Sequence, residues 1–292
     1  CPATGAIVLR LQDLTLELGN KDPSVLPGID QAYAYLAKRG IPYEMIDKLG
    51  LMLVRAGPLI ERIKGRGGVV DSRIAIIIPH PDKLGGVRDW WSCRLVDTMG
   101  ALGSRGFASL VQGTRAKMLC PPGERPEAYF PPNIEWNPQD GDYIYFHESA
   151  IKAINGAALG YYSIGLNGVW GWCSKRHDCA LLPEIRDLPW KEKNLQPVIV
   201  FDSNVDSNPD VGRAVQEFAA RVETITGRAC KHILLPKNSE GADWGFDDFR
   251  VTLGDAAARA YLDSALDAPL LELSEFKRLF LKLQSEVVVV RS

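Results

Sequence analysis

Two short apolar runs, each ending at an acidic residue, most constrain what this chain can fold into. The first is YIYFHE at residues 143–148, and the second is PVIVFD at residues 197–202. Their β-branched and aromatic residues are typical of buried strands, and helical patterns follow both. This alternation predicts an α/β fold with a mainly parallel sheet flanked by helices. In such a sheet Glu148 and Asp202 lie at the carboxyl ends of neighbouring strands, where ligands bind.

An acidic loop follows the second run. Asp202, Asn204 and Asp206 alternate, so their oxygens point the same way from an extended segment. Asp247 and Asp248, in the loop GADWGFDDF, add carboxylates at the same sheet edge. Carboxylates gathered at one edge repel each other, and a hard cation relieves that repulsion, so Mg²⁺ or Mn²⁺ is expected. The alternative is that the strand-end acids are ordinary caps of the helices that follow.

The helical pattern after the acidic loop has clear ends. Asn208 and Pro209 are a cap and a first-turn proline, and Gly227 is a C-terminal stop. The apolar stripe between them consists of Val211, Val215, Phe218, Val222 and Ile225. Upstream, residues 143–166 read as strand, helix and strand, which predicts a βαβ unit.

Composition limits the class of protein. The 292 residues are 46% apolar and 24% charged, which is ordinary for a soluble globular chain with one large or two modest domains. No run reaches eighteen uninterrupted apolar residues and there is no signal peptide, so a cytoplasmic protein that binds no membrane is expected. The first residue is Cys1 and not methionine, which indicates a fragment of a longer protein.

The net charge of −2 is no footprint of bulk nucleic-acid binding, so any such binding must come from a local basic patch. Basic residues gather in the half of the chain that precedes the acidic runs. A basic region combined with an acidic metal site is the layout that an enzyme acting on nucleic acid needs. The candidate residues for binding nucleic acid or nucleotides are Arg73, Arg94, Arg115, Lys117 and Lys152.

Together these residues resemble a Toprim domain, the metal-binding α/β module of bacterial replicative primases, topoisomerases and some nucleases. In that family a Glu follows the first strand and Asp-x-Asp follows a later one, which Glu148 and Asp202-Ser203-Asn204 match here. The family's further acid corresponds to Asp247 or Asp248. Two positions depart from the pattern, because Ser149 stands where primases have Gly and Asn204 replaces the second Asp.

The upstream half is similar to bacterial primase cores. AYLAKRGI, RIAIIIPHPD, WWSCRLV and KMLCPPGERPEAYFPP occur in the order of that family's motifs, within residues 34–132. The chain also resembles the primase-like Toprim proteins of phages and plasmids that lack a zinc ribbon. This resemblance implies a smaller α+β primase-type N-terminal subdomain at residues 1–140, a Toprim domain at 141–255 and a C-terminal helical segment at 256–292.

The resemblance implies a nucleotidyltransferase that makes short primers on single-stranded DNA in phage, plasmid or mobile-element replication. The implied partners are the template, nucleoside triphosphates and a helicase or another replication protein. Glu148 would be the general base or the organiser of the metal site. Arg73, Arg94 and Lys117 would hold the template and the triphosphate. The alternatives are a Toprim nuclease and a DNA-binding replication protein without catalysis, which the Asn204 departure favours.

Overall fold

The computed structural model describes residues 28–65, 67–68, 71–86, 88–97, 116–174, 180–205 and 207–267, together with Leu11 and Leu26. The chain divides into two compact units, Cys1–Arg125 and Pro126–Ser292. Arg115, Asp206 and the part of the expected C-terminal helix beyond Asp267 lie outside the described residues. Among the described helices, none is both long and apolar enough to cross a membrane.

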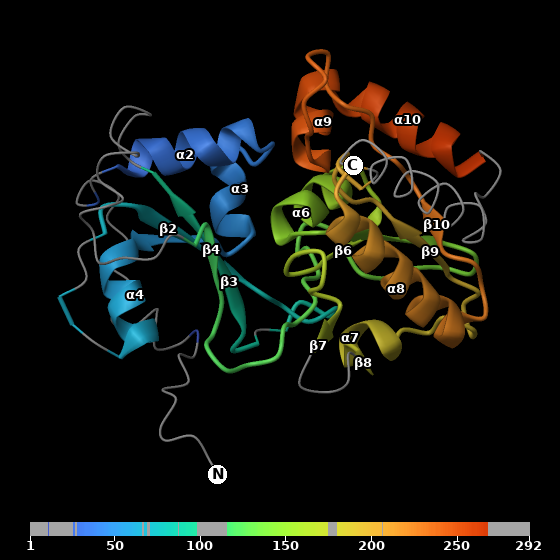
Figure 1. Cartoon of the computed structure of the whole chain (residues 1–292), viewed down its shortest axis with the longest axis horizontal. Helices are drawn as coiled ribbons and strands as arrows, with labels where there is room; N and C mark the ends of the chain where they lie inside the picture. The colour runs from blue at the N-terminus through green and yellow to red at the C-terminus, as the bar shows by residue number, and fades with distance from the viewer. Residues whose placement is uncertain are drawn as a thin grey trace, which may run out of the picture. The chain divides into compact units, whose positions relative to one another are not determined.

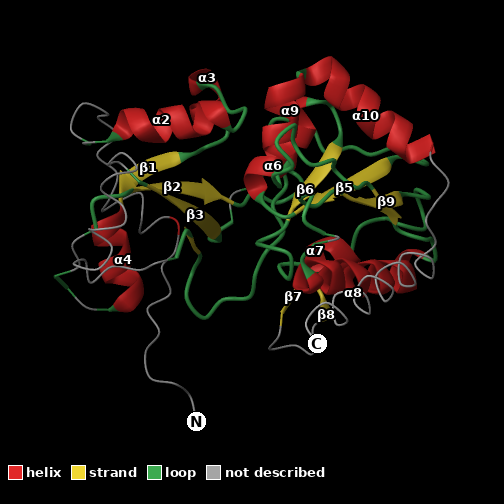
Figure 2. Ribbon diagram, turned by 45° about the horizontal axis from the view of Figure 1, so that its top comes forward, coloured by secondary structure: helices red, strands yellow, loops and turns green. Residues whose placement is uncertain are grey.

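The first unit is built on an antiparallel sheet with the strand order β1-β2-β3-β4. The strands are β1 Met52–Arg55, β2 Ile74–Pro79, β3 Trp91–Val96 and β4 Met118–Leu119. The helices are α2 Ile29–Lys38, α3 Tyr43–Lys48 and α4 Ala56–Lys64. Figure 2 shows α2 and α3 on one side of this sheet and α4 on the other. The motif segments RIAIIIPHPD and WWSCRLV thus contain β2 and β3.

The second unit contains a four-stranded parallel sheet with the order β10-β9-β5-β6 (Figure 1). Its strands are β5 Tyr143–His147, β6 Tyr162–Gly165, β9 Gln196–Ile199 and β10 Lys231–His232. Phe146 pairs with Ile164 of β6 on one side and with Ile199 of β9 on the other, so β5 is an inner strand. The predicted parallel sheet and the βαβ unit are confirmed.

Helices cover both faces of the parallel sheet. They are α6 Ala150–Ala158, α7 Pro183–Arg186, α8 Pro209–Thr226, α9 Phe246–Leu253 and α10 Asp255–Asp267. In Figure 2, α6, α9 and α10 lie on one face and α7 and α8 on the other. A small antiparallel pair, β7 Cys173–Ser174 and β8 Ala180–Leu181, lies between β6 and α7 in the sequence.

Helix α8 begins and ends as its sequence predicts. The Asn208 side chain accepts a hydrogen bond from the Asp210 N–H at 3.1 Å, and Pro209 is the first helical residue. Gly227 ends the helix with φ of 72°, a conformation that glycine adopts without steric cost. Its apolar stripe is buried at Val211, Val215, Phe218 and Val222. The helix therefore packs one face against the sheet.

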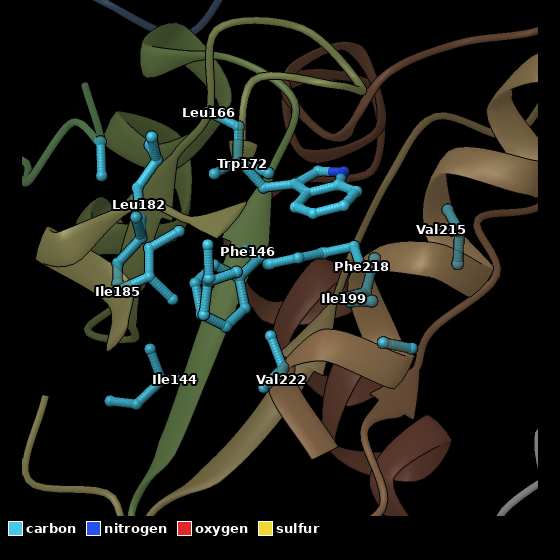
Figure 3. Close-up of a cluster of buried hydrophobic side chains, with 14 of the residues drawn as sticks. Ile144, Phe146, Leu166, Trp172, Leu182, Ile185, Ile199, Val215, Phe218 and Val222 are labelled. Carbon is cyan, nitrogen blue, oxygen red and sulfur yellow. The ribbon is translucent and has the colours of Figure 1, made fainter. Parts of the chain in front are cut away.

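Alternating residues of β5 supply the two cores of the second unit. Phe146 points to the α8 side, where its ring lies 4.9 Å from that of Phe218 in an edge-to-face contact. Trp172 stacks on Phe218, with the ring centroids 5.6 Å apart (Figure 3). Tyr145 belongs to the opposite core, which it shares with α9 and α10. Burial on both faces explains why the strand sequence is an uninterrupted apolar run.

Strand β10 is shorter than the sequence indicates. The apolar pattern predicts a strand over residues 229–235, whereas only Lys231 and His232 pair with β9. The pairing stops after His232 because β9 ends at Ile199. Ile233 and Leu235 are nevertheless buried in the core on the α10 side. The apolar pattern of this segment therefore indicates buried side chains, and not hydrogen bonding to a neighbouring strand.

Candidate functional site

The chain reverses its direction of winding between β5 and β9. After β5 it forms α6 on one face of the sheet and returns to β6, and after β9 it forms α8 on the other face and returns to β10 (Figure 2). Neighbouring strands whose helices lie on opposite faces leave a crevice at their carboxyl ends, which is where α/β sheets bind ligands. Glu148 follows β5 and Asp202 follows β9, so both acids lie at this point.

Glu148 and Asp202 are joined directly. Glu148 Oε1 accepts a hydrogen bond from the backbone N–H of Asp202 at 2.9 Å. Lys152, in the first turn of α6, joins both carboxylates. Its Nζ lies 3.5 Å from Glu148 Oε2 and also forms an ion pair with Asp202 Oδ1. The side chain of Lys152 is 12% exposed, so the ammonium is largely withdrawn from water.

A third carboxylate comes from the start of α9. The loop before α9 is tied to the loop after β9 by two hydrogen bonds, from Ser203 N–H to Trp244 O at 3.1 Å and from Trp244 N–H to Ser203 Oγ at 3.0 Å. This tie places Asp247, which is 2% exposed, beside the other two acids. We call Glu148, Asp202, Asp247 and Lys152 the acidic edge.

Gly245 allows the acidic edge to close. A Cβ at this position would lie 2.7 Å from Lys152 Cε, 2.7 Å from Asp247 Oδ1 and 3.0 Å from Asp202 Oδ1. Those separations are shorter than van der Waals contact, so any side chain at 245 would push one of these groups away. All three side chains therefore converge on one small space beside Gly245.

Burial and charge shift the pKa values at the acidic edge in a consistent direction. Burial raises the pKa of the Asp202 carboxyl to about 6, with the charges of Glu148 and Asp247 adding to the rise and that of Lys152 opposing it. Burial acts to lower the pKa of Lys152, but the negative charges of Glu148, Asp202 and Asp247 outweigh it and raise that pKa. The ammonium is therefore charged at neutral pH, and it faces more carboxylate than it can neutralise.

The acidic edge offers the kind of oxygen ligands expected for Mg²⁺. Carboxylate and amide oxygens are the ligands that this ion prefers. However, the described His, Cys, Asp and Glu residues form no group of three arranged to hold a metal ion. The Lys152 ammonium already lies against Glu148 and Asp202. With the Lys152 ammonium in this position, a divalent ion would have to displace it to reach both carboxylates.

The remaining acidic candidates have separate surroundings. Asn204 Oδ1 is a buried acceptor for which the described part of the chain supplies no hydrogen-bond donor. Asp248 Oδ2 accepts a hydrogen bond from Gly245 N–H at 3.5 Å, at the start of α9. Of the two acids that the sequence leaves open, Asp247 is therefore the one whose charge acts on Lys152 and Asp202. Asp206 lies outside the described residues.

The candidate basic residues of the first unit differ in their surroundings. Arg73 forms an ion pair with Asp71 at 2.6 Å and donates to the carbonyl of Ala116. The Arg94 guanidinium lies over the Tyr35 ring, 5.4 Å from its centroid. Lys117, beside β4, is exposed. Arg73 is thus engaged in holding its own unit together, and Lys117 presents its charge to solvent.

Sequence reasoning missed two contributors to the acidic edge. Lys152 was assigned to nucleotide binding, and its ion pairs with Glu148 and Asp202 were not predicted. The signal was its position four residues after Glu148, because residues at that spacing are neighbours on a helix surface. Gly245 carried no such signal, since its closeness to Asp202 depends on how α9 docks.

Comparison with known proteins gives partial matches. Residues 138–257 match the model of a family described as a domain of unknown function, DUF3854. No curated protein matches the sequence.

Two solved structures resemble the chain at low identity. The primase fragment of the bacteriophage T7 primase-helicase protein has 14% identity and a TM-score of 0.44, with 77% of this chain and 72% of that chain covered. A structure of the bacteriophage T7 lagging-strand DNA polymerase interacting with primase domains of two gp4 subunits, bound to an RNA/DNA hybrid and dTTP, has 13% identity and a TM-score of 0.44. It covers 77% of this chain and 88% of that chain.

Proposed function

We propose that this chain is a primase-like nucleotidyltransferase that acts on single-stranded DNA, with its reaction centre at the acidic edge. One observation carries the proposal. Glu148 and Asp202 follow neighbouring parallel strands at the point where the sheet reverses its winding, and the Glu148 carboxylate accepts a 2.9 Å hydrogen bond from the backbone N–H of Asp202. The Toprim-like order of the motifs in the sequence supports the same assignment.

The residues of the acidic edge have distinct roles in this proposal. The Glu148 carboxylate is oriented by the backbone N–H of Asp202, which suits an organiser of the site or a general base. Mg²⁺ or Mn²⁺ is the proposed cofactor, with Asp202, Asn204 and Asp247 as its ligands and Asp206 and Asp248 as further candidates. Such an ion supplies positive charge against phosphate oxygens.

The basic first unit supplies the proposed contacts to nucleic acid. Lys117 is exposed and suits a phosphate contact. Arg94 and Arg115 are the other proposed contacts, and Arg73 contributes by holding β2 beside residue 116. A helicase or another replication protein, a phage, plasmid or mobile-element setting and a cytoplasmic location belong to the same proposal.

A second candidate function is DNA binding without catalysis. The position of Lys152 favours it, because an ammonium between two carboxylates offsets part of their charge without a metal ion. A nuclease is the remaining rival and would use water as the nucleophile at the same carboxylates. Neither rival requires nucleoside triphosphates, which makes the three functions separable.

One assay distinguishes these functions. The protein is incubated with a labelled single-stranded template and nucleoside triphosphates, with Mg²⁺, with Mn²⁺ and without either. We expect short oligonucleotides that are lost in Glu148→Gln and in Asp202→Asn. The matched controls are Glu192→Gln and Asp140→Asn, which change exposed acids of the same unit and should keep the activity.

The other results have defined meanings. Degradation of the template without triphosphates would establish the nuclease. Binding of the template with neither synthesis nor cleavage would establish the binding protein. Equal synthesis by Asp202→Asn and the parent would remove the acidic edge from the reaction.

A further inference from the structure

Lys152 has no role in the proposed reaction, although it lies at the acidic edge. It comes from the first turn of α6, and its side chain turns towards the end of the sheet. Its Nζ lies 3.5 Å from Glu148 Oε2 and pairs with Asp202 Oδ1. The ammonium therefore contacts acids from both sides of the point where the winding reverses.

The surroundings fix this position. Asp247 is buried beside the pair, and its charge adds to those of Glu148 and Asp202 at the ammonium. Gly245 leaves room for the last methylene of the lysine, because a Cβ there would approach Lys152 Cε to 2.7 Å. The lysine is thus enclosed by three carboxylates and by a backbone that carries no side chain.

An ammonium and a divalent ion compete for the same oxygens. Both are positive, so a divalent ion bound to Glu148 and Asp202 would be repelled by an ammonium in contact with the same two groups. Lysine has a flexible four-carbon stem, so its head group can leave the site while its backbone stays in α6. Either cation can offset part of the negative charge of the acids, and the two cannot occupy the same oxygens together.

We infer that Lys152 is the built-in cation of the acidic edge, and that its ammonium and a divalent metal ion are alternative occupants of the same carboxylates. The inference deepens the proposed function, because it rests on the same site and names the residue that controls metal entry. It implies that the resting protein carries part of the counter-charge of these acids in its own side chain, without metal. Metal then binds only as strongly as it can displace the lysine.

Binding of Mn²⁺ alone tests this inference without nucleotide or DNA. Free Mn²⁺ is measured by electron paramagnetic resonance for the parent, Lys152→Met and Lys152→Arg. We expect Lys152→Met to bind Mn²⁺ roughly tenfold or more tightly than the parent, because a nearby positive charge is gone. Lys152→Arg keeps the charge and should bind as weakly as the parent.

Two further variants establish where the ion binds. Lys191→Met removes an exposed lysine of the same unit and should leave Mn²⁺ binding unchanged. Adding Asp202→Asn to Lys152→Met should abolish the gain. If Lys152→Met binds no more tightly than the parent, or if the gain survives Asp202→Asn, the inference is wrong.

Loss of folding is also informative. Lys152→Met leaves three carboxylates without their counter-ion, so circular dichroism is recorded with and without Mn²⁺. A variant that folds only with Mn²⁺ supports the inference, since the metal then replaces the lysine. A variant that stays unfolded with Mn²⁺ overturns it, because the two cations are then not interchangeable.

The outcome is independent of the primer-synthesis assay. A protein that makes no oligonucleotides can still show the exchange of Lys152 for Mn²⁺, which would leave this inference in place and remove the proposed reaction. The reverse result, synthesis with no effect of Lys152 on Mn²⁺ binding, would keep the reaction and remove the inference.

Discussion

Glu148 Oε1 accepts the backbone N–H of Asp202 at 2.9 Å across 54 residues of sequence. This hydrogen bond connects the loop after β5 with the loop after β9. The Glu148 carboxylate therefore both holds the two loops together and adds a negative charge to the acidic edge. Substitutions of Glu148 therefore have to separate the two contributions.

Truncating Glu148 should weaken the fold more than neutralising it. Glu148→Ala removes the acceptor of a partly buried N–H, which should lower the free energy of unfolding by about 1–3 kcal/mol. Glu148→Gln keeps a side-chain oxygen for that N–H and should lose less. Urea denaturation measures both, with exposed Glu192→Ala as the control. Equal stability of Glu148→Ala and the parent would show that the hydrogen bond from Asp202 N–H to Glu148 does not stabilise the fold.

A methyl group at Gly245 should displace Lys152. The Cβ of Gly245→Ala would meet Lys152 Cε and Asp247 Oδ1 at 2.7 Å each, and these side-chain ends can move. We expect a loss of about 1–3 kcal/mol in the free energy of unfolding and faster acylation of the released Lys152 amine. Mass spectrometry after brief acylation measures the second effect.

Lys191 is the exposed internal reference for that labelling, and Gly67→Ala is the control for adding a methyl group, since nothing lies within 4 Å of its added Cβ. Unchanged acylation of Lys152 in Gly245→Ala would mean that the lysine is not held against residue 245.

Stability should fall in mild acid because of His147. Burial lowers the pKa of His147 to about 3, and the charge of Lys152 adds to the shift. The unfolded chain takes up a proton near the ordinary histidine pKa of about 6.5 while the folded chain does not, so stability is present above that pH and is lost as the pH falls. At about pH 5 the loss from this residue is about 2 kcal/mol.

His147→Gln tests that loss, because glutamine does not titrate. Its free energy of unfolding should depend less on pH than that of the parent between about pH 7.5 and about pH 5. Burial lowers the pKa of His232 to about 4, which keeps some dependence of the same sign. The raised pKa of Asp202 acts in the opposite sense in both proteins. Parallel pH profiles for variant and parent would contradict the prediction.

Lys117 and Arg73 should respond differently to removal. Lys117→Ala should reduce the salt dependence of single-stranded DNA binding by about one ion and leave the melting temperature unchanged, because Lys117 is exposed. Arg73→Ala should lower the melting temperature, because it breaks the pair with Asp71 and the bond to Ala116 O. If Lys117→Ala binds DNA with the affinity and salt dependence of the parent, Lys117 is an exposed residue that does not contact DNA.

The strands of the acidic edge could be predicted because burial on both faces leaves a strong local signature. Phe146 and Ile199 lie in runs made mainly of β-branched and aromatic residues, and each run ends where the chain leaves the core. The same reasoning placed Glu148 and Asp202 at strand ends. The pairing of β5 with β9 followed from the general behaviour of parallel sheets.

Which charged side chains meet at the acidic edge could not be predicted in the same way. Adjacent residues of a helix project about 100° apart, so the choice between Asp247 and Asp248 depends on the rotation of α9 against the sheet. That rotation is set by packing and not by local sequence. Lys152 likewise reaches Asp202 only because β9 docks beside β5. In contrast, the pair of Arg73 with Asp71, two residues away, was open to prediction from sequence alone.

The strand order also fixes when the acidic edge can exist during synthesis. Strands β5 and β6 are complete by Gly165, but the second neighbour of β5 is β9, which begins at Gln196. Until β9 has emerged from the ribosome, β5 is an edge strand with open backbone groups and exposed aromatic side chains, a state that favours aggregation. Asp202 therefore joins the acidic edge with the strand that covers β5, and a fragment ending before residue 196 should be both inactive and poorly soluble.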